Sequence, residues 1–262
     1  MIPKKIHYCW FGNNEKPQLV KDCISSWKIY LPDFEIIEWN ETNTDLLSNS
    51  FVKNAYKLKK WAFVSDYIRL QKLSEIGGIY LDTDMLFVKK INSIFLHSDM
   101  FISCENDSFI SAGIIGAKKN YFFIEKLLDY YNNININKFT NLFEITIPKI
   151  ITQEFRKEFN YNGNFKKTIH LKSLKIFPSE YFYSLPSDSS VDKKKYKKYL
   201  TDNSYAVHLW GESWVSKNEF ELIRRKEYYL GFKQAFYSFN HQKNKVKYIR
   251  KILSSIKQSL KQ

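Results

Sequence analysis

The chain has 262 residues, of which 44% are hydrophobic and 17% aromatic, so it can bury a substantial core, which argues against global disorder. Its formal net charge of +14 favours an anionic partner: nucleic acid, an anionic lipid or a phosphorylated small molecule. The sequence lacks a run of about 18 apolar residues, the length that a membrane-spanning helix requires.

The cysteines and the N-terminal residues bear on the cellular compartment. Cys9, Cys23 and Cys104 are odd in number and scattered, which argues against a disulfide framework or a structural zinc site. The first residues lack the apolar run and the small-residue cleavage site of a signal peptide. We therefore expect a cytoplasmic location.

The first third of the chain alternates predicted strands and helices. Residues 6–10 predict a short strand, residues 17–30 a helix and residues 34–39 a second strand, an order typical of a βαβ unit and an α/β fold with a parallel sheet. The most regular helix is predicted over 61–76, and Gly77-Gly78 supplies a stop for it. Residues 79–81 then predict a short buried strand that leads directly into Asp82-Thr83-Asp84.

The rest of the chain predicts one α/β domain over residues 1–236 and a distinct tail over residues 237–262. Further strands are predicted at 100–104, 112–117, 169–177 and 205–210, and a helix at 121–131. The tail contains seven Lys or Arg residues, no Asp or Glu, and an apolar stripe at helical spacing: Val246, Ile249, Ile252, Leu253, Ile256 and Leu260. Two interpretations stay open, a basic amphipathic helix lying on an anionic membrane and a terminal helix docked on the domain by its apolar stripe.

The Asp82-Thr83-Asp84 segment is the main candidate for chemistry. If the extended backbone continues past the strand, both carboxylates project to one side and repel each other. A hard divalent cation such as Mn²⁺ or Mg²⁺ relieves this repulsion and can bridge to substrate phosphates. A solvated turn is the common alternative for Asp-x-Asp, but open α/β sheets bind ligands at strand ends of this kind.

Asp66 and Arg69 form a second candidate group. They lie three residues apart, which places them on one face of the predicted helix. An exposed ion pair would be the simplest explanation. Their apolar neighbours indicate partial burial, and charges kept in a buried place favour a function.

Three segments of the chain carry recognisable motifs. The first is Ser-Asp-x-x-Arg at 65–69, followed eight residues later by Gly-Gly-x-Tyr-x-Asp-x-Asp. The second is the opening Ile-Pro-x-x-Ile-His-x-x-Trp-x-Gly at 2–12, and the third is His-x-x-x-x-Ser-Trp at 208–214. Together they resemble glycosyltransferase family 32, which includes yeast outer-chain mannosyltransferases and bacterial capsule and lipopolysaccharide enzymes. The glucosylating domains of large clostridial toxins are similar in the same segments.

The resemblance implies a GT-A-type, Rossmann-like domain with a mixed central sheet and transfer from a nucleotide-sugar donor with retention of configuration. Trp10 would stack on the nucleotide base. Asp66 would accept hydrogen bonds from the ribose or the donor sugar, and Arg69 would contact the sugar hydroxyls or the diphosphate. Tyr80 would line the donor pocket.

The resemblance also implies a metal site. Asp84 would be the direct ligand of the Mn²⁺ or Mg²⁺ cofactor, and Asp82 would bridge the ribose and the metal, so that Asp82, Asp84 and Arg69 form the catalytic group. His208 could supply a third ligand through a neutral imidazole, with Glu212 as the alternative.

Two further segments complete the expected site. By the same resemblance, Ser213 would hydrogen-bond a phosphate oxygen and Trp214 would belong to a loop that closes over the donor. Glu105, Asn106 and Asp107 follow the predicted strand at 100–104 and are candidates for contacts with the acceptor or the anomeric centre. No residue is assigned as a nucleophile.

Two other functions fit parts of the sequence. A haloacid-dehalogenase-type phosphohydrolase also uses Asp-x-Asp after an apolar strand, but it needs a later Gly-Asp or Asp-Asp, and neither dipeptide occurs. A nucleic-acid-binding module would explain the charge and the tyrosines interleaved with lysines at 194–199, within the lysine-rich run 192–200, but not the Asp-x-Asp segment. We expect no nucleic-acid partner. The expected acceptor is a glycan or a lipid-linked glycan of surface polysaccharide synthesis, at the inner face of the cell membrane.

Overall fold

The structure is a computed structural model that describes residues 1–137, 140–171, 173–187, 191–211, 219–224, 226–239 and 244–260. These residues form two compact units, Met1–Gly211 and Glu212–Gln262. The division falls earlier than the boundary at residue 236 that the sequence suggested, because the short helix Glu219–Arg224 packs against the helices Tyr228–Phe239 and Lys245–Ser259.

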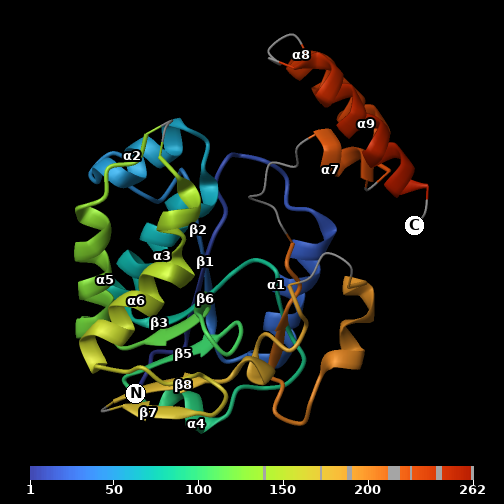
Figure 1. Cartoon of the computed structure of the whole chain (residues 1–262). Helices are drawn as coiled ribbons and strands as arrows, with labels where there is room; N and C mark the ends of the chain where they lie inside the picture. Colours follow the sequence, from blue (N-terminus) through green and yellow to red (C-terminus); the bar gives the residue numbers. More distant parts are fainter. Residues whose placement is uncertain are drawn as a thin grey trace. The chain divides into compact units, whose positions relative to one another are not determined.

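A seven-stranded mixed sheet forms the centre of the first unit (Figure 1), with the strand order β2-β1-β3-β6-β5-β8-β7. Its strands are β1 (Lys5–Cys9), β2 (Glu35–Trp39), β3 (Gly78–Leu81), β5 (Met100–Cys104), β6 (Ile110–Ala117), β7 (Ile169–Leu171) and β8 (Leu174–Phe177). Strand β1 is parallel to both β2 and β3, whereas β6 runs antiparallel to β3 and β5. The βαβ opening is thus confirmed, within a mixed sheet.

Helices cover both faces of this sheet. One core contains buried residues of α2 (Ser50–Lys57), α3 (Trp61–Ile76), α5 (Phe122–Asn132) and α6 (Ile147–Phe159), and the other contains those of α1 (Gln18–Tyr30) and α4 (Ser93–Leu96). Strand β3 shows why both cores form: Tyr80 belongs to the first core, and Ile79 and Leu81 belong to the second. Side chains alternate between the two faces of a strand. A strand that is buried on both faces therefore has apolar residues at successive positions.

The glycine pair after α3 is required by the backbone. Gly77 has φ 71° and Gly78 has φ 119°, conformations that L side chains rarely adopt. A Cβ atom at Gly78 would also lie 2.7 Å from the carbonyl oxygen of Lys5. The pair therefore ends α3 and brings β3 directly alongside β1.

A second, two-stranded sheet joins distant parts of the first unit. Strand β4 (Met85–Phe87) pairs antiparallel with β9 (Ala206–His208), and Met85 lies opposite His208. The chain between β8 and β9 contains the 3₁₀ helices η2 (Ser179–Tyr181) and η3 (Lys193–Tyr199), and η1 (Leu142–Ile145) precedes α6. This small sheet places the two aspartates beside residue 208.

Several elements differ from the sequence-based expectation. The predicted strand at 169–177 is a hairpin of β7 and β8, in which Leu171 pairs with Leu174. Helices α2 and α6 were not expected. The lysine-rich run at 193–199 folds as η3, which Asp192 caps by accepting a hydrogen bond from the Lys194 amide.

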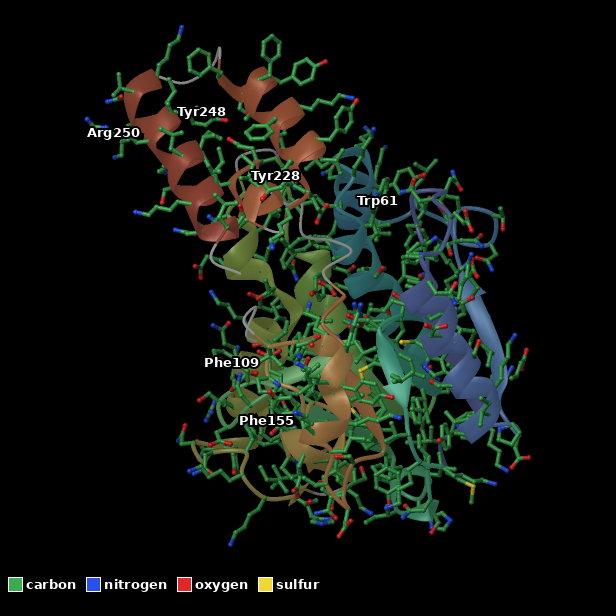
Figure 2. All side chains as sticks on the ribbon, turned by 90° about the vertical axis from the view of Figure 1, so that its right-hand side faces the viewer. Trp61, Phe109, Phe155, Tyr228, Tyr248 and Arg250 are labelled. Atoms are coloured by element: carbon green, nitrogen blue, oxygen red, sulfur yellow. The ribbon has the colours of Figure 1, made fainter. Side chains whose placement is uncertain are left out.

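The second unit consists of α7 (Glu219–Arg224), α8 (Tyr228–Phe239) and α9 (Lys245–Ser259). Tyr248 of α9 is buried and donates hydrogen bonds to Glu219 Oε1 at 2.6 Å and to the carbonyl oxygen of Ala235 at 3.4 Å. Figure 2 shows Tyr248 between α8 and α9, with Arg250 pointing away from both. Within the described ranges, no helix combines the length and apolarity that crossing a bilayer requires.

Candidate functional site

Asp82 and Asp84 flank a tight turn at the end of β3. The Asp82 amide donates to the Gly113 carbonyl at 2.8 Å, which continues the pairing with β6, and the Met85 amide donates back to the Asp82 carbonyl at 3.1 Å. The Leu209 amide donates to the Asp84 carbonyl at 2.9 Å. Both aspartates are therefore held by backbone contacts with neighbouring strands.

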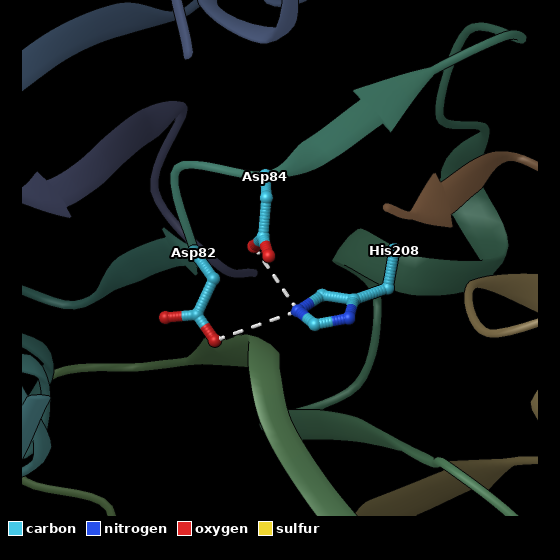
Figure 3. A group of neighbouring side chains, drawn as sticks. All are labelled: Asp82, Asp84 and His208. Atoms are coloured by element: carbon cyan, nitrogen blue, oxygen red, sulfur yellow. Dashed lines mark ion pairs between the residues drawn. The ribbon is translucent and has the colours of Figure 1, made fainter. Parts of the chain in front are cut away.

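His208 joins the two aspartates because β4 and β9 pair next to them (Figure 3). Its Nε2 atom lies 3.1 Å from Asp84 Oδ1 and 4.0 Å from Asp82 Oδ2. One ligand atom from each of the three residues lies within 4.8 Å of the other two. Two carboxylate oxygens and an imidazole nitrogen suit Mn²⁺ and also fit Mg²⁺ through the oxygens, so the residues present fit a divalent cation.

The charges of this group support the same interpretation. Burial lowers the pKa of His208, but Asp84, Asp82 and Glu105 outweigh burial and raise it. Burial acts to raise the pKa of Asp84, but His208 and the Gly211 amide lower it. A protonated His208 thus offsets the negative charge of the two carboxylates, as a bound cation would. Protons and a metal ion therefore compete for the site.

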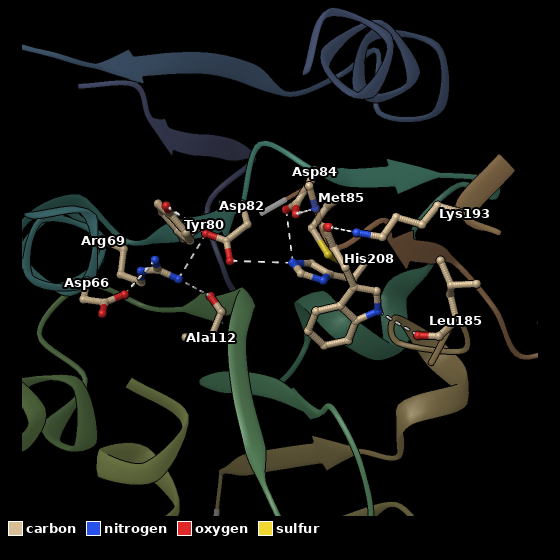
Figure 4. Close-up of polar contacts among 12 residues, drawn as sticks. Asp66, Arg69, Tyr80, Asp82, Asp84, Met85, Ala112, Leu185, Lys193 and His208 are labelled. Atoms are coloured by element: carbon tan, nitrogen blue, oxygen red, sulfur yellow. Dashed lines mark hydrogen bonds and ion pairs between the residues drawn. The ribbon is translucent and has the colours of Figure 1, made fainter. Parts of the chain in front are cut away.

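Asp84 and His208 are held in place by further contacts. The Gly211 amide donates to Asp84 Oδ2 at 2.7 Å. The Trp210 ring packs edge-on against the His208 ring, with centroids 4.2 Å apart, and its Nε1 donates to the Leu185 carbonyl at 2.8 Å. Lys193 donates to the Trp210 carbonyl (Figure 4). His208 Nδ1 is buried, and no partner for it lies among the described residues.

Arg69 is the centre of a buried network on the other side of Asp82 (Figure 4). Its Nη2 atom lies 2.9 Å from Asp66 Oδ1, and its Nη1 atom lies 3.2 Å from Asp82 Oδ1. It also donates to the Ala112 carbonyl at 2.8 Å and to the Ser65 carbonyl at 3.2 Å. The side chain is only 5% exposed, so the network positions Asp82, and the expected direct contact of Arg69 with the donor stays a prediction.

Tyr80 strengthens the hold on Asp82. Its hydroxyl donates to Asp82 Oδ1 at 3.2 Å, and its ring lies 4.4 Å from the Arg69 guanidinium. Arg69 and Tyr80 thus fix one oxygen of Asp82 and leave the other facing His208. The two aspartates therefore have different surroundings, in line with the different roles expected for them.

Asp66 is the most deeply buried carboxyl of this network. Burial raises its pKa to about 7, and Arg69 only partly offsets this effect. The pKa of Arg69 is itself raised, because Asp82, Tyr80 and Asp66 outweigh the opposing effect of burial. Arg69 thus remains charged, while Asp66 can take up a proton near neutral pH.

The other expected site residues are placed less completely. Trp10 follows β1, is half-buried, and donates from Nε1 to the Asn14 carbonyl at 2.7 Å. Its stacking on a base stays a prediction. Glu212, Ser213 and Trp214 lie outside the described residues, so their roles stay predictions as well.

Two residues of the site were missed by the sequence reasoning. At Gly113, a Cβ atom would lie 2.8 Å from the Tyr183 hydroxyl, 3.1 Å from Asp82 Oδ2 and 3.3 Å from His208 Cδ2. Tyr183 packs against His208, with ring centroids 5.4 Å apart. The run of small residues at 111–113, inside a strand, was the available signal, because it lets neighbours approach the backbone.

A pocket of ≈ 550 Å³ adjoins this group. It is lined by residues 105–108 and by Ser179, Tyr183, Ser184, Pro186 and Ser187. Tyr183 belongs both to the pocket wall and to the surroundings of Asp82 and His208. Glu105 is partly buried there, and burial raises its pKa, although His208 and Ser111 oppose the shift.

The mixed sheet, with the Asp-x-Asp pair directly after β3, has a GT-A-type fold. Residues 17–101 match the family described as "Glycosyltransferase sugar-binding region containing DXD motif", which confirms the resemblance stated above. The solved structure "PaToxG Glycosyltransferase" is similar with a TM-score of 0.50 and 21% identity, over 61% of this chain and 70% of that one.

Two curated proteins are also similar in sequence. The lactosylceramide 4-alpha-galactosyltransferase of Mus musculus is 26% identical over 164 residues, and that of Rattus norvegicus is 23% identical over 164 residues. Each match covers 57% of this chain and 41% of the relative. The chain therefore spans about two fifths of the length of these relatives.

Proposed function

We propose that this protein is a metal-dependent, retaining glycosyltransferase that moves a hexosyl or N-acetylhexosaminyl group from a UDP- or GDP-linked donor to a glycan. The observation that supports this most is the group of Asp82, Asp84 and His208, backed by the buried Arg69. Its donor atoms can hold a divalent cation at the edge of the sheet, where α/β proteins bind nucleotides. The match of residues 17–101 to DXD-containing glycosyltransferases agrees with this chemistry.

The reaction would use these residues in distinct ways. A bound Mn²⁺ or Mg²⁺ ion supplies Lewis-acid stabilisation of the diphosphate leaving group. Asp84 and His208 would bind this ion through a carboxylate oxygen and an imidazole nitrogen. Arg69 and Tyr80 orient Asp82. Trp10 is proposed to stack on the base, and Ser213 and Trp214 to close over the donor.

The transfer step exchanges one bond for another. The acceptor oxygen forms a bond to the anomeric carbon, and the bond from that carbon to the diphosphate oxygen breaks. The nucleoside diphosphate leaves with the electron pair, and the hydroxyl proton passes to its released oxygen. No protein nucleophile is part of this proposal.

Donor hydrolysis tests the proposed function. Purified protein is incubated with a panel of UDP- and GDP-sugars, with and without Mn²⁺, and the released nucleotide is measured. We expect Mn²⁺-dependent hydrolysis of at least one donor and a loss of about 100-fold or more in Asp84→Asn, the scale expected when charge stabilisation of a transition state is removed. The control Glu144→Gln changes an exposed carboxyl that pairs with Lys149 and should hydrolyse normally. Hydrolysis of no donor, together with no stabilisation by any nucleotide plus Mn²⁺, would refute the proposal.

The second unit supports a peripheral contact with an anionic membrane. Helix α9 buries Tyr248, Ser255 and Ser259 and, with Leu260 directly after it, exposes an apolar stripe of Val246, Ile249, Leu253 and Leu260, each at least 45% exposed. The packing within the second unit therefore leaves this stripe uncovered, whereas an amphipathic helix usually buries its apolar face. Helix α8 likewise exposes aromatic residues: Tyr229, Phe232, Phe236 and Tyr237.

The charge of the same segment selects the kind of surface. Residues 228–262 contain no Asp or Glu, and the exposed residues of α9 include Lys247, Arg250 and Lys257. Apolar, aromatic and cationic side chains together are typical of helices that lie on anionic lipid. We therefore propose that the enzyme works at the inner face of the cell membrane, with a lipid-linked glycan of surface polysaccharide synthesis as its acceptor.

Liposome sedimentation tests the membrane contact. Ile249→Ser/Leu253→Ser should bind phosphatidylglycerol vesicles at least tenfold more weakly than wild type, while donor hydrolysis is unchanged. The matched control Ser254→Ala/Gln258→Ala changes the polar face of the same helix and should bind normally. Equal binding of the wild type and the serine variant to the vesicles would refute the contact. So would a wild type that does not bind the vesicles but forms a dimer, if the serine variant is a monomer.

A further inference from the structure

The pocket adjoins the metal-binding group through Tyr183. Its wall includes Tyr183, whose hydroxyl lies 2.8 Å from the point that a Cβ atom at Gly113 would occupy. Asp82 Oδ2 lies 3.1 Å from the same point. A molecule in the pocket is therefore separated from the metal-binding carboxylates by little more than one tyrosine side chain.

The lining suits a sugar. Apart from Tyr183 and Pro186, every lining residue offers a polar side chain, and four of them are serines. Serine hydroxyls and the Asn106 amide both donate and accept hydrogen bonds, as the hydroxyls of a sugar require. The volume of ≈ 550 Å³ lies within the range of small-molecule sites.

The charge of the pocket is opposite to that of the chain. Among the described residues, its lining contains Glu105 and Asp107 and no lysine or arginine, although the chain has 41 Lys and Arg against 27 Asp and Glu. Asp107 lies 3.7 Å from Lys166, and both of these side chains are mostly exposed. For Glu105, the part of the chain that the structure describes supplies no Lys or Arg nitrogen within 4.0 Å. A carboxylate without a close Lys or Arg partner among the described residues therefore faces whatever binds there.

We propose that this pocket holds the acceptor sugar, and that Glu105 makes it select an uncharged sugar over an acidic one. The inference rests on the proposed transferase function and narrows its acceptor. A carboxylate accepts hydrogen bonds from neutral sugar hydroxyls, whereas it repels the carboxylate of a uronic or sialic acid and any sugar phosphate. The anionic part of a lipid-linked acceptor would then lie outside the pocket.

A glycan array tests this selectivity with the full chain. The donor is the one identified by hydrolysis, and the array pairs neutral glycosides with the matching uronic acids, for example glucosides with glucuronides. We expect the donor sugar to be transferred mainly to the neutral glycans. In Glu105→Gln, the transfer rate to acidic glycans relative to neutral ones should rise roughly tenfold, because one repulsive charge within a few ångströms is removed.

The controls separate this inference from the proposed function. Donor hydrolysis without acceptor is measured for the wild type alongside the array, and Glu144→Gln should keep the wild-type ratio. Failure of hydrolysis in the wild type would refute the transferase itself. An array on which no neutral glycan is labelled although the donor is hydrolysed would overturn the acceptor inference, as would an unchanged ratio in Glu105→Gln.

Discussion

Replacing Arg69 with methionine tests whether the buried network supports Asp82. Methionine fills much of the same space but has no charge and no donor. The change leaves Asp66, whose side chain is 8% exposed, without its cation. Breaking a buried ion pair by removing one partner costs about 3–5 kcal/mol, because an uncompensated charge remains. Asp82 adds less to this cost, because 29% of its side chain is exposed.

The pH dependence of the loss follows from Asp66. Burial already raises its pKa to about 7 with Arg69 present, and removing the guanidinium raises it further. A carboxyl with a raised pKa binds more protons in the folded than in the unfolded protein, so stability falls as pH rises from the unfolded value of about 4 through the folded one. Arg69→Met should therefore be most destabilised above pH 7 and less so at pH 5, where Asp66 is protonated.

Urea denaturation at pH 8 and pH 5 measures this effect, with unfolding followed by circular dichroism. The double variant Asp66→Asn/Arg69→Met should recover about 2 kcal/mol of the loss at pH 8, because it removes the orphaned charge. Arg69→Lys should lose stability as well, since one ammonium group cannot bridge Asp66 and Asp82. A loss below about 1 kcal/mol at pH 8, or no recovery in the double variant, would refute the reasoning.

Three further outcomes are expected. Saturating Mn²⁺ should raise the melting temperature of the wild type but not that of Asp84→Asn. An ion at 100 times its Kd adds about 2.7 kcal/mol to the free energy of unfolding. Equal shifts of both proteins in differential scanning fluorimetry would contradict the metal site. Gly113→Ala should lower kcat/KM for donor hydrolysis by roughly 10- to 100-fold, because the new methyl displaces Tyr183 or Asp82 from the site; unchanged kinetics would show that the site has more room. Burial lowers the pKa of His7 from 6.5, so the unfolded protein binds more protons than the folded one. Below pH 6.5, the free energy of unfolding of the wild type should therefore fall by up to about 1.4 kcal/mol per pH unit relative to that of His7→Asn. Parallel curves of unfolding free energy against pH would contradict this.

The first half of the fold could be predicted because its signals are local. The spacing of apolar residues gave α1 and α3, and Gly77-Gly78 marked the end of α3. Helix α6 was missed because its Pro148 resembles a helix breaker, whereas proline in the first turn helps to start a helix. The turn between β7 and β8 was missed because the sequence there has no Gly, Pro, Asn or Asp, and Ser173 is a weaker turn former than these.

The site was predictable where one segment carried it and less so where distant segments meet. Asp66 and Arg69 share one turn of α3, and Asp82 lies two residues after Tyr80 in the sequence. The position of His208 beside Asp84 depends on the pairing of two three-residue strands more than 100 residues apart, which no periodic pattern could reveal. Family resemblance supplied that residue, and the pairing of Met85 with His208 explains how it reaches the aspartates.

Net charge was informative about surfaces and misleading about the pocket. The value of +14 is a sum over the chain, whereas a ligand responds to the field at the place where it binds. Cations gather on α9, whereas the described residues of the pocket lining have only carboxylates among their charged groups. If the acceptor is lipid-linked, as proposed, its anionic anchor and its neutral sugar would contact differently charged parts of the protein.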